Sequence, residues 1–161
     1  MIGITGHRSF EMADAAQRVD RLLDEIIDAR RPIVISCLAE GADRMVADLV
    51  LARPNAGLAV VLPLPADDYE RDFGGAASVA EFRALLARAE TVETVDVPAD
   101  APREQAYEQA GQCVVQRCEV LIAVWDGAPS RGRGGTGEIL QYARRVGRCV
   151  EVVSVTRGVP S

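Results

Sequence analysis

Short apolar runs alternate regularly with longer stretches of helical periodicity along this chain, and the alternation leaves few folds open. The runs are rich in Val, Ile and Leu and occupy residues 1–5, 32–37, 58–63, 91–97, 119–125 and 149–155. Because their apolar character is continuous rather than alternating, they predict β-strands covered on both faces, as in a parallel sheet.

The stretches between the runs have the spacing of helices. One apolar stripe consists of Val19, Leu22, Leu23, Ile26 and Ile27. Ser78 and Glu81 form a capping-box pattern, followed by a second stripe of Phe82, Leu85, Leu86 and Ala89. Further helices are predicted over 43–51, 102–115 and 136–145. Strands alternating with helices imply right-handed crossovers and an α/β fold: a Rossmann-like, doubly wound, mostly parallel sheet with helices on both faces.

Length and charge narrow the classes of protein. With 161 residues, the chain is expected to form a single domain over 1–161. Its net charge of −6 argues against a nucleic-acid partner, since proteins that bind nucleic acid usually carry clustered positive charge. All eighteen cationic residues are arginine, which excludes a P-loop lysine, a Schiff-base lysine and a lysine base.

No membrane, metal or cofactor site is predicted. The longest apolar run is about one strand long, whereas a membrane span needs roughly 20 residues. The N-terminal "MIGITGHR" lacks a secretory pattern, so a cytoplasmic location is expected. The cysteines contain no C-x-x-C pair and His7 is the single histidine, so buried free thiols are expected at Cys37, Cys113, Cys118 and Cys149.

Four loops are predicted to meet at the carboxyl ends of the strands, where sheets of this type bind ligands. They read "TGHRSF", "LAEGADR", "PLPADDYERDF" and "DGAPSRGRGGTGE". Several have glycine at or just before a helix start, where backbone N–H groups bind anions. Four arginines lie in or beside these loops and are candidate phosphate clamps: Arg8, Arg44, Arg131 and Arg133.

The last loop also contains a literal G-x-G-x-x-G at Gly132, Gly134 and Gly137. In dinucleotide enzymes this fingerprint closes the first strand and opens the first helix, with an acid at the end of the second strand. Here it follows the fifth strand, and the second strand ends at Ser36 and Cys37. Hydride transfer is therefore not the expected chemistry.

The motifs "GITGHR", "CLAEGADR" and "WDG…GGTGE" follow the first, second and fifth predicted strands in that order. Together they resemble the SLOG superfamily, which unites the Smf/DprA DNA-processing proteins with the Lonely Guy phosphoribohydrolases. The segment "LPADDYERDF", followed by "EFRALLARA", is similar to the stand-alone, sensor-like branch. The resemblance implies binding of a nucleotide or nucleotide-derived ligand, with its phosphate at the glycine-rich turn.

Residue by residue, the resemblance covers the turn and the second loop. The matching positions are Gly41, Ala42, Gly134, Gly135, Thr136 and Gly137. The hydrolytic members carry P-G-G-x-G-T-x-x-E and a separate arginine–lysine motif. In this chain Arg133 stands at the proline, Glu138 at the threonine and Gln141 at the final glutamate. The catalytic carboxylate is thus missing or displaced onto Glu138.

Other candidate ligand contacts come from the first two loops. Gly6, His7 and Arg8 follow the first strand, and His7 is expected to face solvent or a ligand, with no acidic partner identified by the sequence. Asp43 begins a helix and either complements the helix dipole or contacts the ligand. Glu138 is in the same position on the last helix, with a ribose hydroxyl as its alternative partner.

The aromatic residues are expected to pack mainly in the core. Tyr69 and Phe73 are spaced i, i+4, and core packing is favoured over a base-stacking platform. Trp125 ends a buried strand and is interpreted as core.

Three functions remain open. The first is a sensor or carrier that binds a small phosphorylated, nucleotide-like ligand. The second is a nucleoside 5′-monophosphate phosphoribohydrolase with Glu138 as its acid group. The third is a dimeric interaction module, and a homodimer formed by helices that flank the sheet, such as the one carrying Phe82 and Leu85, is expected.

Overall fold

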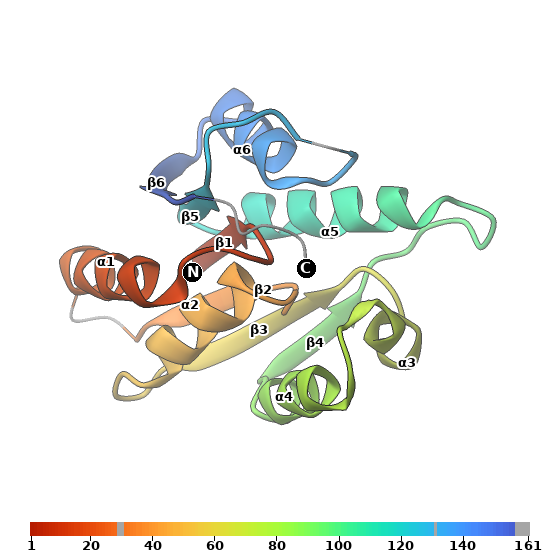
Figure 1. Ribbon diagram of the computed structural model, residues 1–161, viewed down its shortest axis with the longest axis horizontal. Coiled ribbons are helices and arrows are strands. Elements are labelled where there is room, and N and C mark those ends of the chain that lie inside the picture. Colours follow the sequence, from red (N-terminus) through yellow and green to blue (C-terminus); the bar gives the residue numbers. More distant parts are fainter. Residues whose placement is uncertain (29–30, 131, 157–161) are drawn as a thin grey trace.

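The computed structural model describes residues 1–28, 31–130 and 132–156, which form one parallel sheet flanked by helices (Figure 1). Six strands lie in the order β4-β3-β2-β1-β5-β6, and every neighbouring pair is parallel. Their bounds are β1 Ile2–Gly6, β2 Ile33–Ser36, β3 Gly57–Leu62, β4 Thr91–Thr94, β5 Val120–Trp125 and β6 Cys149–Ser154. The Rossmann-like α/β fold that the sequence predicts is confirmed.

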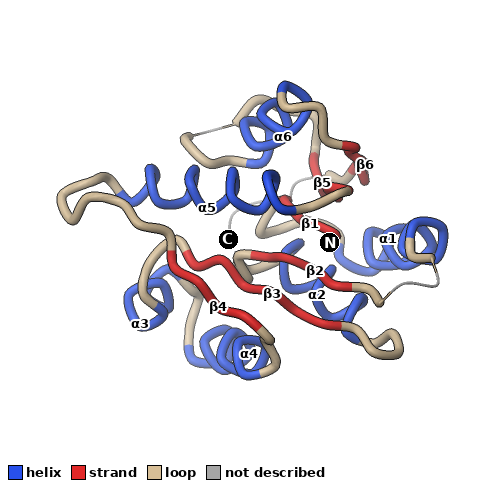
Figure 2. The backbone as a smooth tube through the Cα atoms, turned by 180° about the vertical axis from the view of Figure 1, so that it is seen from behind, coloured by secondary structure: helices blue, strands red, loops and turns tan. Residues whose placement is uncertain are grey.

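Helices cover both faces of the sheet (Figure 2). On one face lie α1 (Met12–Ile26), α2 (Ala42–Leu51) and α4 (Ala76–Ala87), and on the other lie α5 (Arg103–Arg117) and α6 (Thr136–Arg145). A short helix, α3 (Ala66–Tyr69), and a 3-10 turn, η1 (Glu70–Asp72), precede α4. The sequence patterns did not predict α3 and η1 as helical.

The order of the strands reverses at β1. From β1 the chain builds outward through β2, β3 and β4, and α5 then carries it back so that β5 pairs with the free side of β1. Gly6, the last residue of β1, is in register with Val124 of β5. Such a reversal opens a crevice beyond the carboxyl ends of the strands, so the loops after β1, β2 and β5 come together there.

The core has two layers because alternate strand residues point to opposite faces. Val34, Leu58 and Val60 pack toward α1, α2 and α4, whereas their neighbours Ile35 and Val61 pack toward α5 and α6. Apolar runs without alternation are therefore what central strands require, since both faces of the strand are covered.

The capping box predicted at Ser78 is wrong. Helix α4 begins at Ala76 with Gly75 as its N-cap, and no side chain caps it. Ser78 instead lies within the first turn, where its hydroxyl donates to Glu40 Oε2 (2.6 Å) and accepts a hydrogen bond from Arg44 Nη1 (2.9 Å). The apolar stripe after it is a core stripe: Phe82 and Leu85 are buried, so this face of α4 is used within the chain.

Two other expectations need correction. The fourth and sixth apolar runs were expected to form strands covered on both faces, but β4 and β6 are the two edge strands. Every residue of β4 is exposed, and Val153 alone is buried in β6. The thiols were expected to be buried, yet only Cys118 is; Cys37 and Cys113 are half-buried and Cys149 is exposed, all four being free. Among the described residues, no helix is long and apolar enough to cross a membrane.

Candidate functional site

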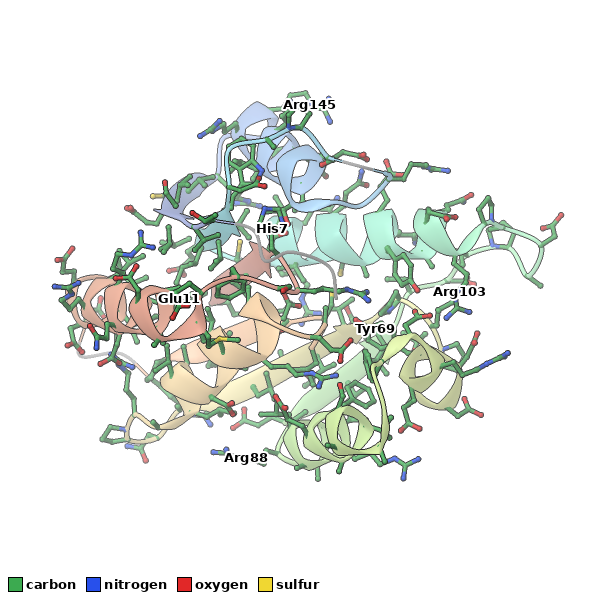
Figure 3. All side chains as sticks on the ribbon, viewed as in Figure 1. His7, Glu11, Tyr69, Arg88, Arg103 and Arg145 are labelled. Carbon is green, nitrogen blue, oxygen red and sulfur yellow. The ribbon has the colours of Figure 1, made fainter. Side chains whose placement is uncertain are left out.

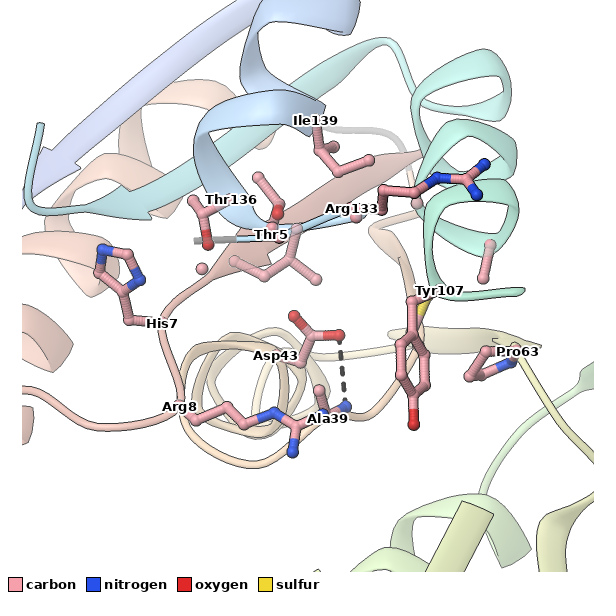
Figure 4. Close-up of a pocket in the computed structure, with 18 of the residues that line it drawn as sticks. Thr5, His7, Arg8, Ala39, Asp43, Pro63, Tyr107, Arg133, Thr136 and Ile139 are labelled. Carbon is pink, nitrogen blue, oxygen red and sulfur yellow. Dashed lines mark hydrogen bonds between the residues drawn. The ribbon is translucent and has the colours of Figure 1, made fainter. Parts of the chain in front are cut away.

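A cavity of about 440 Å³ lies beyond the carboxyl ends of β1, β2 and β3, with α5 and the turn before α6 forming its other walls (Figure 4). Its volume is typical of small-molecule sites, roughly 300–1,000 Å³. Eight predicted ligand residues line it: Gly6, His7, Arg8, Asp43, Arg133, Gly134, Gly135 and Thr136. Gly41, Ala42, Gly137 and Glu138 were predicted as contacts but are not among its lining residues.

The floor of the cavity is a close junction between the end of β1 and the start of α2. A Cβ atom at Gly6 would lie 2.3 Å from the Ala42 Cβ, and one at Gly41 would lie 2.5 Å from the carbonyl oxygens of His7 and Arg8. Gly41 also has φ +85°, a conformation that glycine adopts without strain. The Ala42 N–H donates to the His7 carbonyl (3.1 Å), which fastens the two segments together. Gly41 and Ala42 therefore do not line the cavity but support the residues that form its floor.

His7 is buried rather than facing solvent, which corrects one half of the sequence expectation. Its ring nitrogen Nε2 lies 3.1 Å from the Asp126 backbone N–H and 3.0 Å from Asp126 Oδ1. When unprotonated, Nε2 accepts from that N–H; when protonated, it pairs with the carboxylate. Asp126 is thus the acidic partner that the sequence did not identify, and it anchors the β5 loop to the first loop.

Asp43 is the single carboxylate among the lining residues, and its residue surface is only 6% exposed. The Ser36 hydroxyl donates to Oδ2 (3.1 Å), and the Ala39 N–H approaches the same oxygen (3.4 Å). Burial raises the pKa of the carboxyl to about 6, against hydrogen bonds from Ser36 and from the N–H groups of Ala39 and Cys37 and against the charge of Arg8. A proton donor or acceptor that titrates near neutrality thus lies at the cavity wall.

Aromatic residues form the opposite wall. Tyr69 is buried and packs edge-to-face on Phe73 (4.9 Å between ring centroids), which confirms that these two residues belong to the core. Tyr69 also reaches the cavity, beside the half-exposed ring of Tyr107 from α5. Burial raises the pKa of the Tyr69 hydroxyl, and of the Cys37 thiol that also lines the cavity, well above their ordinary values.

Tyr107 is the wall residue that the sequence reasoning missed. Its hydroxyl bonds to Asp72, and Arg103, one turn earlier on α5, pairs with Asp72 and Asp68 at 2.9 Å each. These contacts fasten α3 and η1 to the start of α5, where Figure 3 shows Arg103 and Tyr69. The signal available in the sequence was the small residues Ala110 and Gly111 one turn further on, which mark a helix face approached by another segment.

The glycine-rich turn packs tightly against its surroundings. Gly134 has φ +75°, and a Cβ there would lie 2.8 Å from the Glu108 backbone nitrogen on α5. At Gly135 a Cβ would lie 2.9 Å from the hydroxyl oxygen of Ser130. Close approach within the chain therefore explains both glycines.

Ser130 supplies a side-chain cap for α6. Its hydroxyl oxygen accepts the Glu138 N–H at 2.7 Å, while the N-cap residue Gly135 has no side chain to do so. Among the described residues, the N–H groups of Thr136 and Gly137 have no acceptor. Thr136, whose hydroxyl points toward the cavity in Figure 4, brings this end of α6 to the site.

The four arginines differ in their surroundings. Arg8 is exposed at the cavity, and its side chain passes close to Asp43 (Figure 4). Arg133 also lines the cavity but is paired with Glu108 (2.6 Å). Arg44 is buried behind the site, with its guanidinium 4.4 Å above the Phe73 ring and bonds to Leu38 and Ser78, so its assignment to the phosphate is wrong. Arg131 lies outside the described residues.

Two further residues differ from the sequence interpretation. Glu138 is half-buried on α6 but does not reach the cavity, and Gln141, at the position of the family's glutamate, is exposed. Trp125 is half-buried rather than core, and its indole N–H donates to the Ala128 carbonyl (2.9 Å). It thereby holds the start of the loop that leads to Ser130.

Within the described ranges, no group of three or more His, Cys, Asp or Glu side chains could hold a metal ion. No protein-family model matches the chain, and no curated protein matches it either. The arrangement offers backbone N–H groups and an arginine for an anion, a buried carboxylate for a hydroxyl or amine, and an aromatic ring for a flat group.

Proposed function

We propose that this protein binds a small phosphorylated, nucleotide-like ligand in the cavity and acts as a sensor or carrier. The observation that carries the proposal is the pair of N–H groups at Thr136 and Gly137, which find no acceptor among the described residues and lie at the start of a helix whose first residue lines the cavity. A helix N-terminus favours an anion through its dipole and its unpaired donors. The motifs that resemble the SLOG superfamily support the same placement of a phosphate.

Arg8 is the second element of the proposal, because its guanidinium is exposed at the cavity and paired with no described residue. Arg133 is already neutralised by Glu108 and has to share or exchange this partner before it can contact a phosphate. We therefore expect Arg8 to supply most of the positive charge and Arg133 less.

Thermal-shift and calorimetric titration with AMP, ADP-ribose, cyclic nucleotides and pterin-type phosphates test the proposal. Replacing Arg8 with alanine is expected to weaken binding by about 1.5–3 kcal/mol, the value of a hydrogen bond to a charged group. Arg88→Ala is the matched control, since Arg88 is exposed on the end of α4 and does not line the cavity. A protein that none of these compounds stabilises would contradict the proposal.

Hydrolysis of the N-glycosidic bond of a nucleoside 5′-monophosphate is the second candidate, and Asp43 favours it. Cleavage passes through an oxocarbenium-like sugar that a nearby carboxylate stabilises. Glu138 does not line the cavity whereas Asp43 does, so a hydrolase would depend on Asp43. Chromatographic detection of free base, lost in Asp43→Asn and retained in Glu138→Gln, would establish this activity; no release by the parent protein would exclude it.

A homodimer remains a proposal that rests on the fold alone. The apolar stripe of α4 that the sequence offered for pairing is occupied by the core, through Phe82 and Leu85. If a dimer forms, it therefore uses another surface. Light scattering at micromolar concentration decides the question, and a monomer with and without nucleotide would exclude the dimeric interaction module.

A further inference from the structure

Asp43 lines the cavity with a carboxylate whose Oδ2 is held by two protein donors, whereas Oδ1 is not held by them. The Ser36 hydroxyl and the Ala39 N–H both donate to Oδ2, and the Cys37 N–H also stabilises the ionised carboxyl. Neither of the two bonds to Oδ2 uses Oδ1. The residue is 94% buried, taking its exposed fraction of 6%, and it lines the cavity, so Oδ1 faces the space that a ligand would fill.

The environment of Oδ1 limits which hydrogen-bond donors of a ligand can bind to it. A planar fork of two donors, such as a guanine edge or a guanidinium, requires both carboxylate oxygens side by side. Because Oδ2 is engaged by protein donors, one hydroxyl or amine is the matching partner. Arg8 passes close by but forms no ion pair with Asp43.

The position of Asp43 selects between these donors. In Figure 4 it lies between Thr136, at the start of α6, and the ring of Tyr107 on the opposite wall. A ligand with its phosphate at α6 and its flat base against Tyr107 places its sugar over Asp43. The sequence of chemical groups across the cavity (anion donors, hydroxyl acceptor, aromatic ring) follows the sequence of groups in a nucleotide.

We propose that Asp43 recognises a ribose hydroxyl, so that the site distinguishes ribonucleotides from deoxyribonucleotides. The inference rests on the proposed function, since it assumes a nucleotide in the cavity, and it adds the class of sugar. Asp43 thereby determines specificity for the sugar. A ligand without the hydroxyl leaves a buried carboxylate oxygen desolvated and unpaired, and sites of this kind reject such analogues strongly.

Calorimetric titration of the four ribonucleoside 5′-monophosphates, together with their 2′-deoxy and 3′-deoxy counterparts, tests the proposal at neutral pH. We expect at least one deoxy series to bind about ten- to a hundredfold more weakly than the ribonucleotides. In Asp43→Asn this preference should fall to less than about threefold, because the negative hydrogen-bond acceptor has been removed. Asp100→Asn, on the exposed surface, controls for the loss of one charge and should retain the full preference.

The outcomes separate the two proposals. If ribo- and deoxyribonucleotides bind the parent protein equally, the role of Asp43 is refuted while nucleotide binding stands. A preference that persists in Asp43→Asn refutes it too. If no nucleotide of either sugar binds, both proposals fail. The comparison of ligands on the parent protein does not depend on the variant, and thermal unfolding checks that Asp43→Asn is folded.

Discussion

Replacing Asp43 with asparagine is expected to stabilise the ligand-free protein at neutral pH, although it removes a proposed ligand contact. Burial raises the pKa of this carboxyl to about 6, whereas aspartate in an unfolded chain titrates near pH 3.9, an approximate reference value. Between about pH 4 and pH 6 the folded protein therefore holds a proton that the unfolded chain has lost. The raised pKa of Asp43 therefore stabilises the folded protein fully below about pH 4. This stabilisation falls as the pH rises from about 4 to 6, and it is lost above pH 6.

The change in the free energy of unfolding follows from the difference between the pKa values of Asp43 in the folded and unfolded states. Each pH unit corresponds to about 1.4 kcal/mol, so keeping Asp43 ionised at neutral pH lowers the free energy of unfolding by about 2–3 kcal/mol. The asparagine oxygen can keep both hydrogen bonds that Oδ2 now accepts, from Ser36 and Ala39. Allowing for weaker bonds to a neutral acceptor, we expect Asp43→Asn to gain about 1–3 kcal/mol at pH 7.5 and nearly nothing at pH 4.5.

Urea unfolding of parent and variant between about pH 4.5 and pH 8 measures this difference directly. Other groups that face Asp43 do not distort the comparison. Cys37 and Tyr69 stay neutral because burial raises their pKa values, and Arg8 stays charged. A variant that is less stable than its parent at pH 7.5, or a difference that does not change with pH, would refute the reasoning.

Three other substitutions test the packing around the site by chemical denaturation. Ser130→Ala removes the α6 cap and should lower the free energy of unfolding by about 1 kcal/mol; no loss would mean that water replaces the hydroxyl. Gly134→Ala forces a side chain into a left-handed conformation against α5 and should cost about 1–3 kcal/mol, whereas Gly132→Ala, with open space around it, should be neutral. Arg44→Leu leaves buried acceptors unpaired and should cost about 2–4 kcal/mol; an unchanged midpoint would contradict its role behind the site.

The parallel sheet could be predicted from the sequence because its central strands are buried on both faces. Such strands consist of continuous apolar residues, which are visible in the sequence. "AVVLP" and "LIAVW" admit few other interpretations. The edge strand was harder, because Thr91–Thr94 mixes polar and apolar residues and lies exposed, so its length and cover were misjudged. Helix α3 was missed since four residues are too few to show a period.

The location of the candidate site could also be predicted, because topology alone brings these loops to one edge. The partners within it could not. Asp126 binds His7 across 119 positions, and Glu108 pairs with Arg133 across 25. Such pairs depend on the tertiary packing of loops and helices that are far apart in the sequence, and local sequence patterns do not predict this packing. Nothing in the sequence was a reason to treat the loop arginines differently. In the structure Arg8 is exposed, Arg133 is paired with Glu108 and Arg44 is buried.

The junction of Gly6 with Gly41 and Ala42 has a consequence for how such a site can diverge. Since the main chain of the floor packs against the Ala42 and Val124 Cβ atoms at Gly6 and against main chain at Gly41, with no room for a Cβ at either glycine, point mutations cannot reshape it gradually. Tyr107 of α5, by contrast, is half-buried and reaches the cavity through its side chain. Variation that changes the ligand is therefore confined to the walls, and a library aimed at new ligands should leave residues 6 and 41 unaltered and randomise wall positions such as 107.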